Sequence, residues 1–170
     1  MRFFMIICVI FAHIWAFGIE DLHSIKRDNI KGDFVQSKKL RGFKNALVSY
    51  GNFSIINDEL FWDTTKPVIS HIKITAEGIF SLQNGEWVAT SQNYDRSLFL
   101  SIIRLDLGAL QDSFDFVISG DKDAWQLSLL PKGVLKNVFR NIEISGGEFV
   151  NRVILVESNG DFTENIFSVK

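Results

Sequence analysis

Two histidines beyond residue 18, His23 and His71, have side chains that commonly act in catalysis or metal binding. A histidine serves as a general base or a metal ligand when a carboxylate, a nucleophile or further ligands surround it. His71 and Lys73 alternate with Ile72 and Ile74, which places His71 on the polar side of a strand, and His23 is expected on the polar side of a short helix. Neither has a catalytic partner at an informative spacing. The sequence also contains no H-x-x-x-H, G-x-S-x-G or glycine-rich phosphate loop.

The segment Asp121-Lys122-Asp123 is a second candidate, because acidic residues at alternate positions begin many calcium loops. It lacks the number of ligands and the terminal glutamate that such a loop needs. We interpret it as a solvated turn. The sequence therefore predicts no catalytic residue, no metal site and no cofactor, and it does not support an enzymatic function.

The apolar residues are more informative than the polar ones. Between Phe34 and Gly78, apolar and polar residues mostly alternate in three successive pieces, which end at Gly, Asn-Asp or Thr-Lys-Pro. A period of two predicts strands with one apolar and one polar face. Successive strands with tight links form an antiparallel meander, and the apolar face of that meander must be covered.

Similar patterns predict about ten or eleven strands in the whole chain. Asn84-Gly85 is a strong hairpin-turn signal within this series. The expected strands are Phe34–Arg41, Ala46–Asn57, Leu60–Asp63, Ser70–Thr75, Ile79–Gln83, Trp87–Thr90, Phe114–Ser119, Trp125–Pro131, Phe139–Ser145, Val150–Glu157 and Asn165–Val169.

Two helices are predicted in addition to the strands. Residues 19–31 have apolar side chains at helical spacing, acidic residues early and basic residues late, which indicates a short amphipathic helix that closes at Gly32. Residues 97–110 are strongly apolar at spacings of three and four, which predicts a helix broken near Gly108. This second helix is either a permanent part of the core or a movable cover over one face of the sheet.

The first residues are typical of a secretory signal peptide: Arg2 is followed by a mostly apolar run up to Gly18. Cleavage is expected after Gly18, or else after Ala16. The alternative is an uncleaved membrane anchor, but the run is short for a bilayer span, which needs roughly 20 residues. We therefore divide the chain into a signal peptide, 1–18, and one domain, 19–170.

Export and composition limit the function of this domain. Cys8 is the only cysteine, so the chain after cleavage has no disulfide and no thiol. Loss of Arg2 changes the formal charge from −2 to −3, and no basic cluster stands out, which argues against nucleic acid as a partner. An acidic, cysteine-free exported domain fits the bacterial periplasm.

The predicted sheet has more apolar face than one helix can bury. The chain contains 16 phenylalanines, most of them in the expected domain. The excess face folds onto itself, dimerises or receives an apolar ligand. The alternation assigns one common face to Leu47, Phe53, Ile55, Leu60, Trp62, Ile72 and Ile74.

Several of these patterns together resemble the LolA-type periplasmic lipoprotein carriers, and the shorter variant branch of that family most closely. The resemblance covers nearly the whole expected domain and rests on the order and spacing of strand-and-turn motifs. These motifs are F-x-Q-x-K from Phe34, G-x-F at Gly51–Phe53, L-F-W-D-T-T-K-P at Leu60–Pro67, I-x-I-T-x-E-G at Ile72–Gly78, W-x-L-x-L-x-P at Trp125–Pro131 and E-x-N-G-D-x-T-x-x-x-F at Glu157–Phe167.

The resemblance implies a mainly β protein: an unclosed antiparallel β-barrel of about 11 strands, with short helices as a lid over an apolar cavity. It implies a monomer that carries the acyl chains of a lipoprotein or another lipid from an inner-membrane donor complex to an outer-membrane acceptor, without a cofactor. The seven residues of the common face would then line the cavity. The lid would present Leu98, Phe99, Ile102, Ile103 and Leu110.

One position departs from the family pattern. Typical members hold the lid with an arginine after the G-x-L/F strand, whereas the nearest match here is Asn57, a neutral amide. A neutral amide makes a weaker contact than a charge-assisted hydrogen bond. The alternative functions are a non-carrying interaction module that docks on a membrane lipid-synthesis complex and, less favoured, a hydrolase.

Overall fold

The computed structural model describes residues 17–90 and 96–170. The predicted signal peptide therefore lies almost entirely outside the described residues and stays a prediction. In the described part of the chain, no helix is both long enough and apolar enough to cross a membrane.

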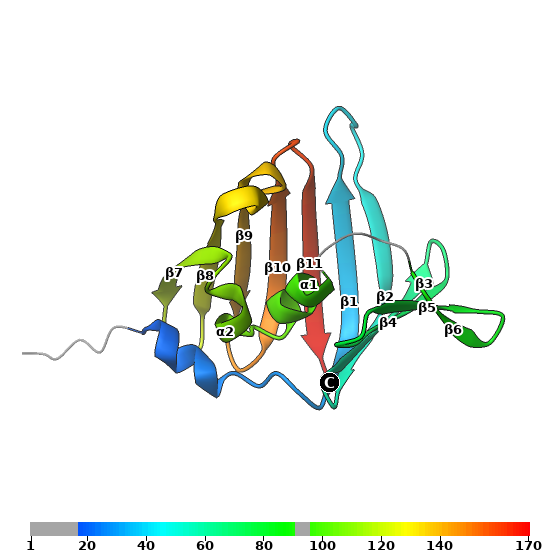
Figure 1. Cartoon of the computed structure of the whole chain (residues 1–170), viewed down its shortest axis with the longest axis horizontal. Coiled ribbons are helices and arrows are strands. Elements are labelled where there is room, and N and C mark those ends of the chain that lie inside the picture. The colour runs from blue at the N-terminus through cyan, green and yellow to red at the C-terminus, as the bar shows by residue number, and fades with distance from the viewer. Residues whose placement is uncertain (1–16, 91–95) are drawn as a thin grey trace, which may run out of the picture.

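One antiparallel sheet contains the eleven described strands, in the order β6-β5-β4-β3-β2-β1-β11-β10-β9-β8-β7. Strands that follow one another in sequence pair, except β6 and β7, and β1 also pairs with β11, at the other end of the chain. Strands β6 and β7 are the two edges, so the barrel does not close. Figure 1 shows β7 to β2 as a broad layer, β3 to β6 bent away from it, and the helices on one side. The predicted mainly β, unclosed architecture is confirmed.

Eight of the eleven strands lie within one residue of the predicted bounds, whereas β1 and β11 begin earlier and β3 ends later. The observed bounds are β1 Ile30–Lys39, β2 Leu47–Ile56, β3 Glu59–Lys66, β4 Ser70–Ile74, β5 Ile79–Gln83, β6 Glu86–Ala89, β7 Phe114–Gly120, β8 Trp125–Pro131, β9 Phe139–Gly146, β10 Val150–Glu157 and β11 Phe162–Val169.

Strand β1 begins earlier than predicted because its first residues pair on both sides. Gly32 pairs with Phe53 of β2 and with Val169 of β11. A Cβ atom at Gly32 would lie 2.1 Å from the carbonyl oxygen of Ser168. Only glycine permits this close approach of the two backbones, so Gly32 belongs inside a strand and does not end a helix.

The predicted helix over residues 19–31 is wrong in length and type. Only η1, Ile19–Ser24, is helical, and it is a 3₁₀ helix. The backbone is already extended at Ile25, and Asn29 has a φ of 55°, which turns the chain into β1. A short isolated helix is marginal in water, and pairing with two strands is the stronger alternative for the residues from Ile30 onward.

The central helical segment is α1, Arg96–Ile103, followed by α2, Leu107–Leu110. The break lies at Leu105 and Asp106, before Gly108 where it was predicted. Leu105 has a φ of 53°, and the Asp106 side chain caps α2 by accepting a hydrogen bond from the Ala109 amide. The remaining helix is η2, Gly133–Asn137, between β8 and β9.

Two tight turns define the bent part of the sheet. Asn84 and Gly85 have φ values of 52° and 87°, which confirms the predicted hairpin between β5 and β6. Asn57 and Asp58 have φ values of 49° and 66° and form the same kind of turn between β2 and β3. This second turn places the Asp58 side chain near the central helices.

The hydrophobic core lies between the concave face of the sheet and the helices in front of it. Leu22 of η1 and Leu105 and Leu110 of the central segment are completely buried. They pack in one cluster with side chains from strands on both sides of β1. The helices therefore cover apolar residues from both halves of the sheet.

Candidate ligand-binding site

An aromatic cluster occupies the concave face where β1, β2, β3 and β11 meet. The Phe34 and Trp62 rings stack with centroids 3.9 Å apart. Phe167 meets Phe53 and Trp62 edge to face, at centroid distances of 5.2 Å and 5.9 Å. Stacked and edge-to-face contacts are the favoured ones for aromatic pairs. These contacts join the first and the last strand inside the core.

The seven predicted cavity residues share this concave face. Phe53 pairs with Trp62 and Trp62 with Ile72, while Leu60 pairs with both Ile55 and Ile74, so that neighbouring strands present them on one side. Phe53, Ile55, Leu60, Trp62 and Ile74 are buried, Ile72 is half-buried, and Leu47 is exposed. Leu47 lies alone at the other end of β2, beyond the part that the helices cover.

The predicted lid residues lie on α1 and α2, in front of this face (Figure 1). Ile102, Ile103 and Leu110 are buried in the core cluster, and Leu98 is half-buried against it. The Phe99 side chain lies outside the described part of the structure. We use "lid" for α1, α2 and the turn between them. In this structure the lid lies on the sheet, with its apolar side chains against the concave face.

An ion pair connects the lid to the sheet. The Arg104 guanidinium, in the turn between α1 and α2, donates from Nη2 to the Asp58 carboxylate in the β2–β3 turn. Asp58 follows Asn57, the predicted latch residue, and no described hydrogen bond joins Asn57 to the lid. The charge-assisted contact that Asn57 would not provide is therefore present one residue later, with the arginine on the lid.

Arg27 gives the same turn a second charged neighbour. Its Nη2 donates to the carbonyl oxygen of Leu22, and it lies near both Asp106 and Arg104. Burial lowers the pKa of the Arg27 guanidinium from its usual value, the nearby Asp106 carboxylate opposes this shift, and Arg104 adds to it. The Nε atoms of Arg27 and Arg104 are buried, and neither has a hydrogen-bond partner in the described part of the chain. The guanidinium groups of Arg27 and Arg104, at the turn between α1 and α2, are therefore partly removed from water.

A buried amide pair interrupts the apolar concave face. Gln36 of β1 donates from Nε2 to Oδ1 of Asn165 on β11, over 2.9 Å. Asn165 is 1% exposed, and its own Nδ2 group has no hydrogen-bond partner among the described residues. The sequence analysis missed this pair. The spacing of two residues between Thr163, Asn165 and Phe167 places all three on the same, inner face of β11. An unpaired buried donor is a site at which a ligand carbonyl would be stabilised.

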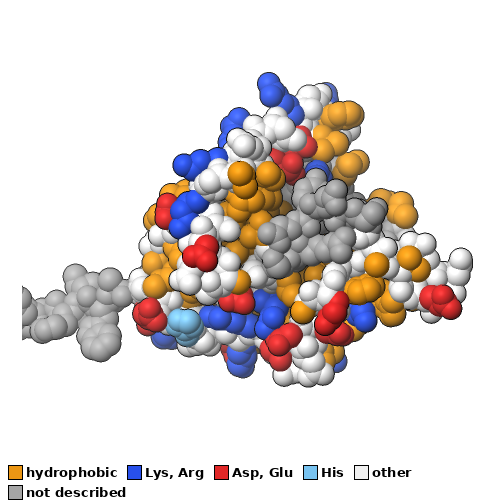
Figure 2. Space-filling model, in the orientation of Figure 1, with side chains coloured by type: hydrophobic (Ala, Val, Ile, Leu, Met, Phe, Trp, Pro, Cys, Tyr) orange, Lys and Arg blue, Asp and Glu red, His pale blue; other side chains and the backbone are white. Residues whose placement is uncertain are grey.

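An open pocket of about 560 Å³ lies between η1, α2 and the edge strand β7. Apolar side chains from all three elements line it, together with polar groups near its edge. They include Ile19, His23, Leu107, Phe114, Phe116 and Lys132. Leu107 and Phe114 also belong to the core cluster, so the pocket adjoins the underside of the lid. Figure 2 shows the apolar side chains that are gathered on this face of the molecule.

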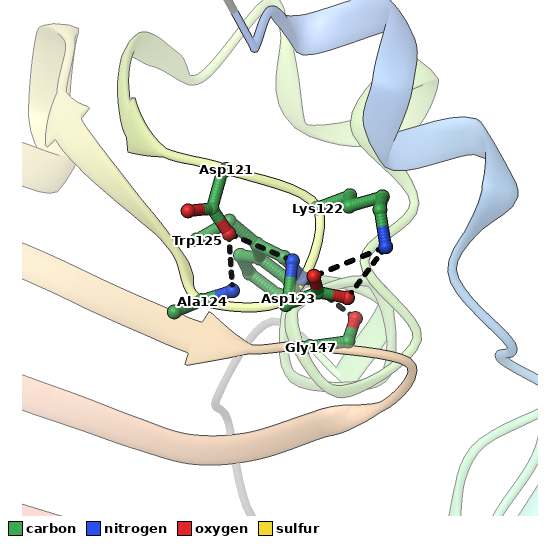
Figure 3. A network of polar contacts seen from close by, with 6 residues as sticks. All are labelled: Asp121, Lys122, Asp123, Ala124, Trp125 and Gly147. Atoms are coloured by element: carbon green, nitrogen blue, oxygen red, sulfur yellow. Dashed lines mark hydrogen bonds and ion pairs between the residues drawn. The ribbon is translucent and has the colours of Figure 1, made fainter.

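The acidic turn between β7 and β8 has a structural explanation (Figure 3). One carboxylate oxygen of Asp121 accepts hydrogen bonds from the amides of Asp123 and Ala124, at 2.9 Å and 3.0 Å, and Lys122 pairs with Asp123. Trp125, 1% exposed, donates from Nε1 to the carbonyl oxygen of Gly147. The Asp121 side chain thus stabilises its own turn. In the described ranges, no group of three His, Cys, Asp or Glu side chains is arranged to hold a metal ion.

His71 has a carboxylate partner that its sequence spacing did not reveal. Its Nδ1 lies 2.7 Å from Oδ1 of Asp63, the residue opposite it on β3. Both side chains are on the outer face and almost half exposed. Such a pair orients an imidazole, but among the described hydrogen bonds no hydroxyl or thiol reaches the ring. The geometry therefore contains an oriented histidine without a nucleophile.

Two solved structures are similar to the chain over most of its length. One is a LolA superfamily protein from Nitrosomonas europaea, 8% identical, with a TM-score of 0.48 over 88% of this chain and 89% of that protein. The other is a chain in the MucA/MucB complex of Pseudomonas aeruginosa, 14% identical, with a TM-score of 0.51 over 89% of this chain and 54% of that one. The chain shares its overall fold with the second of these structures. It spans about half the length of the matched MucA/MucB chain.

The comparisons by sequence are negative. No protein-family model matches the chain, and no curated protein matches it. Identities of this size show a common fold and nothing more specific. The function of this chain has to be argued from its concave face, its lid and its surface.

Proposed function

We propose that the protein is a periplasmic carrier that binds the acyl chains of a lipoprotein or another lipid between the concave face and the lid. The observation that best supports this is the packing of Ile102, Ile103 and Leu110 on the apolar face of an unclosed sheet, with the Arg104–Asp58 ion pair at the turn between α1 and α2. A lid that leaves this face exposes a continuous apolar surface. That surface needs a replacement partner, and acyl chains supply one.

The size of the hydrophobic effect explains why such a carrier is needed. Two sixteen-carbon chains contain about 30 methylene groups, and each contributes about 0.8 kcal/mol on leaving water. The cost of moving the free lipid through water is therefore above about 20 kcal/mol. A carrier must replace most of this apolar contact and still bind more weakly than the acceptor, so that the cargo moves on.

Competition between the lid and the cargo would give this intermediate affinity. The side chains of the lid occupy the face that the cargo needs, so binding of an acyl chain must first separate them from the sheet. The pocket beside α2 adjoins the lid at Leu107 and offers an entry point for the end of a chain. Loading from an inner-membrane donor complex and unloading to an outer-membrane acceptor complete the proposed cycle, after export with the segment 1–18 as signal peptide.

A covalent lock on the lid tests this function. We call the Arg104–Asp58 ion pair the latch. In a Cys8→Ser background, the substitutions Asp58→Cys and Arg104→Cys replace the latch with two thiols, which a short bismaleimide can join. The exported protein without the crosslink should raise the fluorescence of an acyl dye. The crosslinked protein should bind the dye at least about tenfold more weakly, because lid and cargo compete for one face.

The controls separate this effect from chemical modification. Asp58→Cys alone, treated with the same reagent, should keep its dye binding. Leu47→Glu, at the open end of the concave face, should weaken dye binding, whereas Val117→Glu on β7 should not. Phe53 and Trp62 are poor positions for a charge, because both are buried in the aromatic cluster. Equal dye binding by the locked and unlocked proteins would refute the carrier function.

A second candidate function is that of a protein-interaction module. One of the similar solved structures is a chain in the MucA/MucB complex, so one chain with this fold is found in a protein assembly. The outer face of this protein also presents exposed Val35, Tyr50 and Ile166 on the neighbouring strands β1, β2 and β11. Absence of dye binding by the unlocked protein, with its fold intact, would favour this candidate.

A further inference from the structure

Three segments that are distant in sequence form one edge of the sheet. They are the β1–β2 hairpin tip at residues 39–48, the β10–β11 turn at residues 158–161, and η2 with the residues that follow it, 133–140. In Figure 1 they share the upper edge of the sheet, and the hairpin projects farthest. We call this edge the basic rim.

Hydrogen bonds hold the three segments together. The backbone amide of Arg41 donates to Oδ1 of Asp161 over 2.8 Å, and its Nη1 donates to the carbonyl oxygen of Asn159. On the other side of the turn, the backbone amide of Ser158 donates to the carbonyl oxygen of Val138, and its hydroxyl to that of Lys136, both over 2.8 Å. These hydrogen bonds fix the three segments relative to one another, so the rim is one continuous surface and not a set of independent loops.

The charge of the rim is opposite to that of the whole chain. Lys39, Arg41, Lys44, Lys136 and Arg140 are exposed, and none of them takes part in a described ion pair. The two carboxylates beside them are engaged: Glu157 pairs with Lys38 at 3.5 Å, and Asp161 accepts from the Arg41 amide. The whole chain carries a formal charge of −2. Figure 2 shows Lys and Arg side chains along this edge.

The rim also exposes large apolar side chains between these basic residues. Phe43 at the hairpin tip is 66% exposed, Leu47 63% and Val134 of η2 78%. A basic surface that also exposes an aromatic and aliphatic residues matches an anionic bilayer, where cations meet lipid phosphates and apolar side chains enter the headgroup layer. A purely polar polyanion would leave the apolar side chains in water. Charge and apolar exposure together therefore favour a membrane.

We propose that the basic rim docks the protein on the surface of an anionic lipid bilayer, with Phe43 and Val134 inserted among the headgroups. This deepens the proposed function, because Leu47 lies both on the rim and at the open end of the concave face. Docking in this way directs the open end of the concave face toward the lipids. The sequence analysis found no basic cluster because the charges come from separate segments.

Vesicle partition tests the docking. The protein is purified after export, its N-terminus is established by mass spectrometry, and it is sedimented with vesicles of phosphatidylglycerol and phosphatidylethanolamine or of phosphatidylcholine. It should partition onto the anionic vesicles and lose this partition at about 0.5 M salt, where the screening length is about 4 Å. Each basic residue near an anionic surface changes the affinity by about fivefold, so Lys39→Glu with Lys44→Glu should lower partition by about 25-fold or more.

Matched variants at the opposite end of the molecule provide the control. Lys31→Glu with Lys122→Glu changes the charge by the same amount away from the rim and should keep partition within about twofold. Phe43→Ser should weaken partition, whereas Val117→Ser should not. Equal binding to both kinds of vesicle, or an equal loss in the control variant, overturns the proposal. Binding that requires a membrane protein in the vesicles also overturns it, since the rim then recognises a protein.

The same variants separate this inference from the carrier function. Lys39→Glu with Lys44→Glu, and Phe43→Ser, should keep acyl-dye binding in solution, because these substitutions leave the lid and the concave face unchanged. Vesicle binding without dye binding would support the docking proposal and refute the carrier function. Dye binding without a preference for anionic vesicles would support the carrier function and refute the docking proposal.

Discussion

Arg104 on the lid donates a charge-assisted hydrogen bond to Asp58 in the turn between β2 and β3. Side-chain exposures of 26% for Arg104 and 70% for Asp58 place the pair at the boundary of the protein and solvent. Such a pair contributes about 0.2 to 1 kcal/mol to stability, since water and salt screen it. A contact of this strength holds a lid that must still open.

Loss of the latch should therefore change lid opening more than global stability. Asp58→Asn keeps the turn residue small and polar but removes the charge. The free energy of unfolding in urea should fall by less than about 1 kcal/mol. Amide exchange of the lid, and the rate of acyl-dye uptake, should rise by about two- to fivefold at low salt, since 1.4 kcal/mol corresponds to a factor of ten.

The control for this prediction is a pair of equal charge that lies away from the lid. Asp123→Asn breaks the exposed Lys122–Asp123 pair and should leave lid exchange and dye uptake unchanged. High salt should reduce the difference between the wild type and Asp58→Asn. If dye uptake is unchanged in Asp58→Asn at every salt concentration, the ion pair does not limit lid opening.

The latch also shows where sequence reasoning stopped. The β2–β3 turn was correctly located, because Asn57-Asp58 is a local signal. Its function was assigned to Asn57, because the partner of the turn, Arg104, belongs to a segment whose position depends on tertiary packing. The basic rim and the buried Gln36–Asn165 pair were missed for the same reason, since each joins residues from distant parts of the chain.

The strands were more predictable because alternation is a local property. The bounds of β5, β8 and β10 agree with the prediction, and β3 extends beyond Asp63 because Thr64 still pairs with Gly51 and Ser70. Helical periodicity was a weaker guide. The N-terminal segment has the spacing of a helix, but from Ile30 it gains more by pairing with β2 and β11.

The buried amide pair should behave non-additively on mutation. Asn165→Ala removes the acceptor of Gln36 and leaves a small void, so it should lower the free energy of unfolding by about 1 to 3 kcal/mol. Gln36→Leu with Asn165→Leu removes both partners and the unpaired Nδ2 group. The double variant should be as stable as the wild type or more stable by up to about 1 kcal/mol, as measured by urea unfolding.

The same double variant tests whether Asn165 has a function beyond stability. We expect it to bind acyl esters about fivefold more weakly than the wild type, because one hydrogen bond of about 1 kcal/mol to the ester carbonyl is lost. Binding of a saturated hydrocarbon probe should not change. A double variant that is clearly less stable than either single variant would contradict this account of the amide pair.

Stability at low pH should depend on Asp33. Hydrogen bonds from Lys170, 2.5 Å away, and from Asn52 lower the pKa of this carboxyl group from its usual value. A lowered pKa in the folded state means that the ionised group stabilises the fold. This contribution is complete above about pH 4, the unfolded value, and is lost as the pH falls through the lower folded value.

Thermal unfolding between pH 7 and pH 2 measures this effect. Asp33→Asn should flatten the acid side of the stability curve, and Lys170→Met should flatten it in the same direction, because the largest cause of the shift is removed. Lys31→Met, on the same strand, is the matched control and should follow the wild type. Parallel curves for Asp33→Asn and the wild type would show that the lowered pKa makes no contribution to stability.

Trp125 should contribute more to stability than any exposed tryptophan, because its indole is both buried and hydrogen-bonded. Its Nε1 lies 2.8 Å from the carbonyl oxygen of Gly147, and a Cβ atom at Gly146 would lie 2.9 Å from the indole ring. Trp125→Phe leaves this carbonyl unpaired and opens a void, which should lower the free energy of unfolding by about 2 to 4 kcal/mol. Trp87→Phe, at a position 39% exposed, should change it by less than about 0.5 kcal/mol. Equal losses in the two variants would mean that the turn between β7 and β8 does not depend on the indole, and that the Asp121 side chain holds it without help.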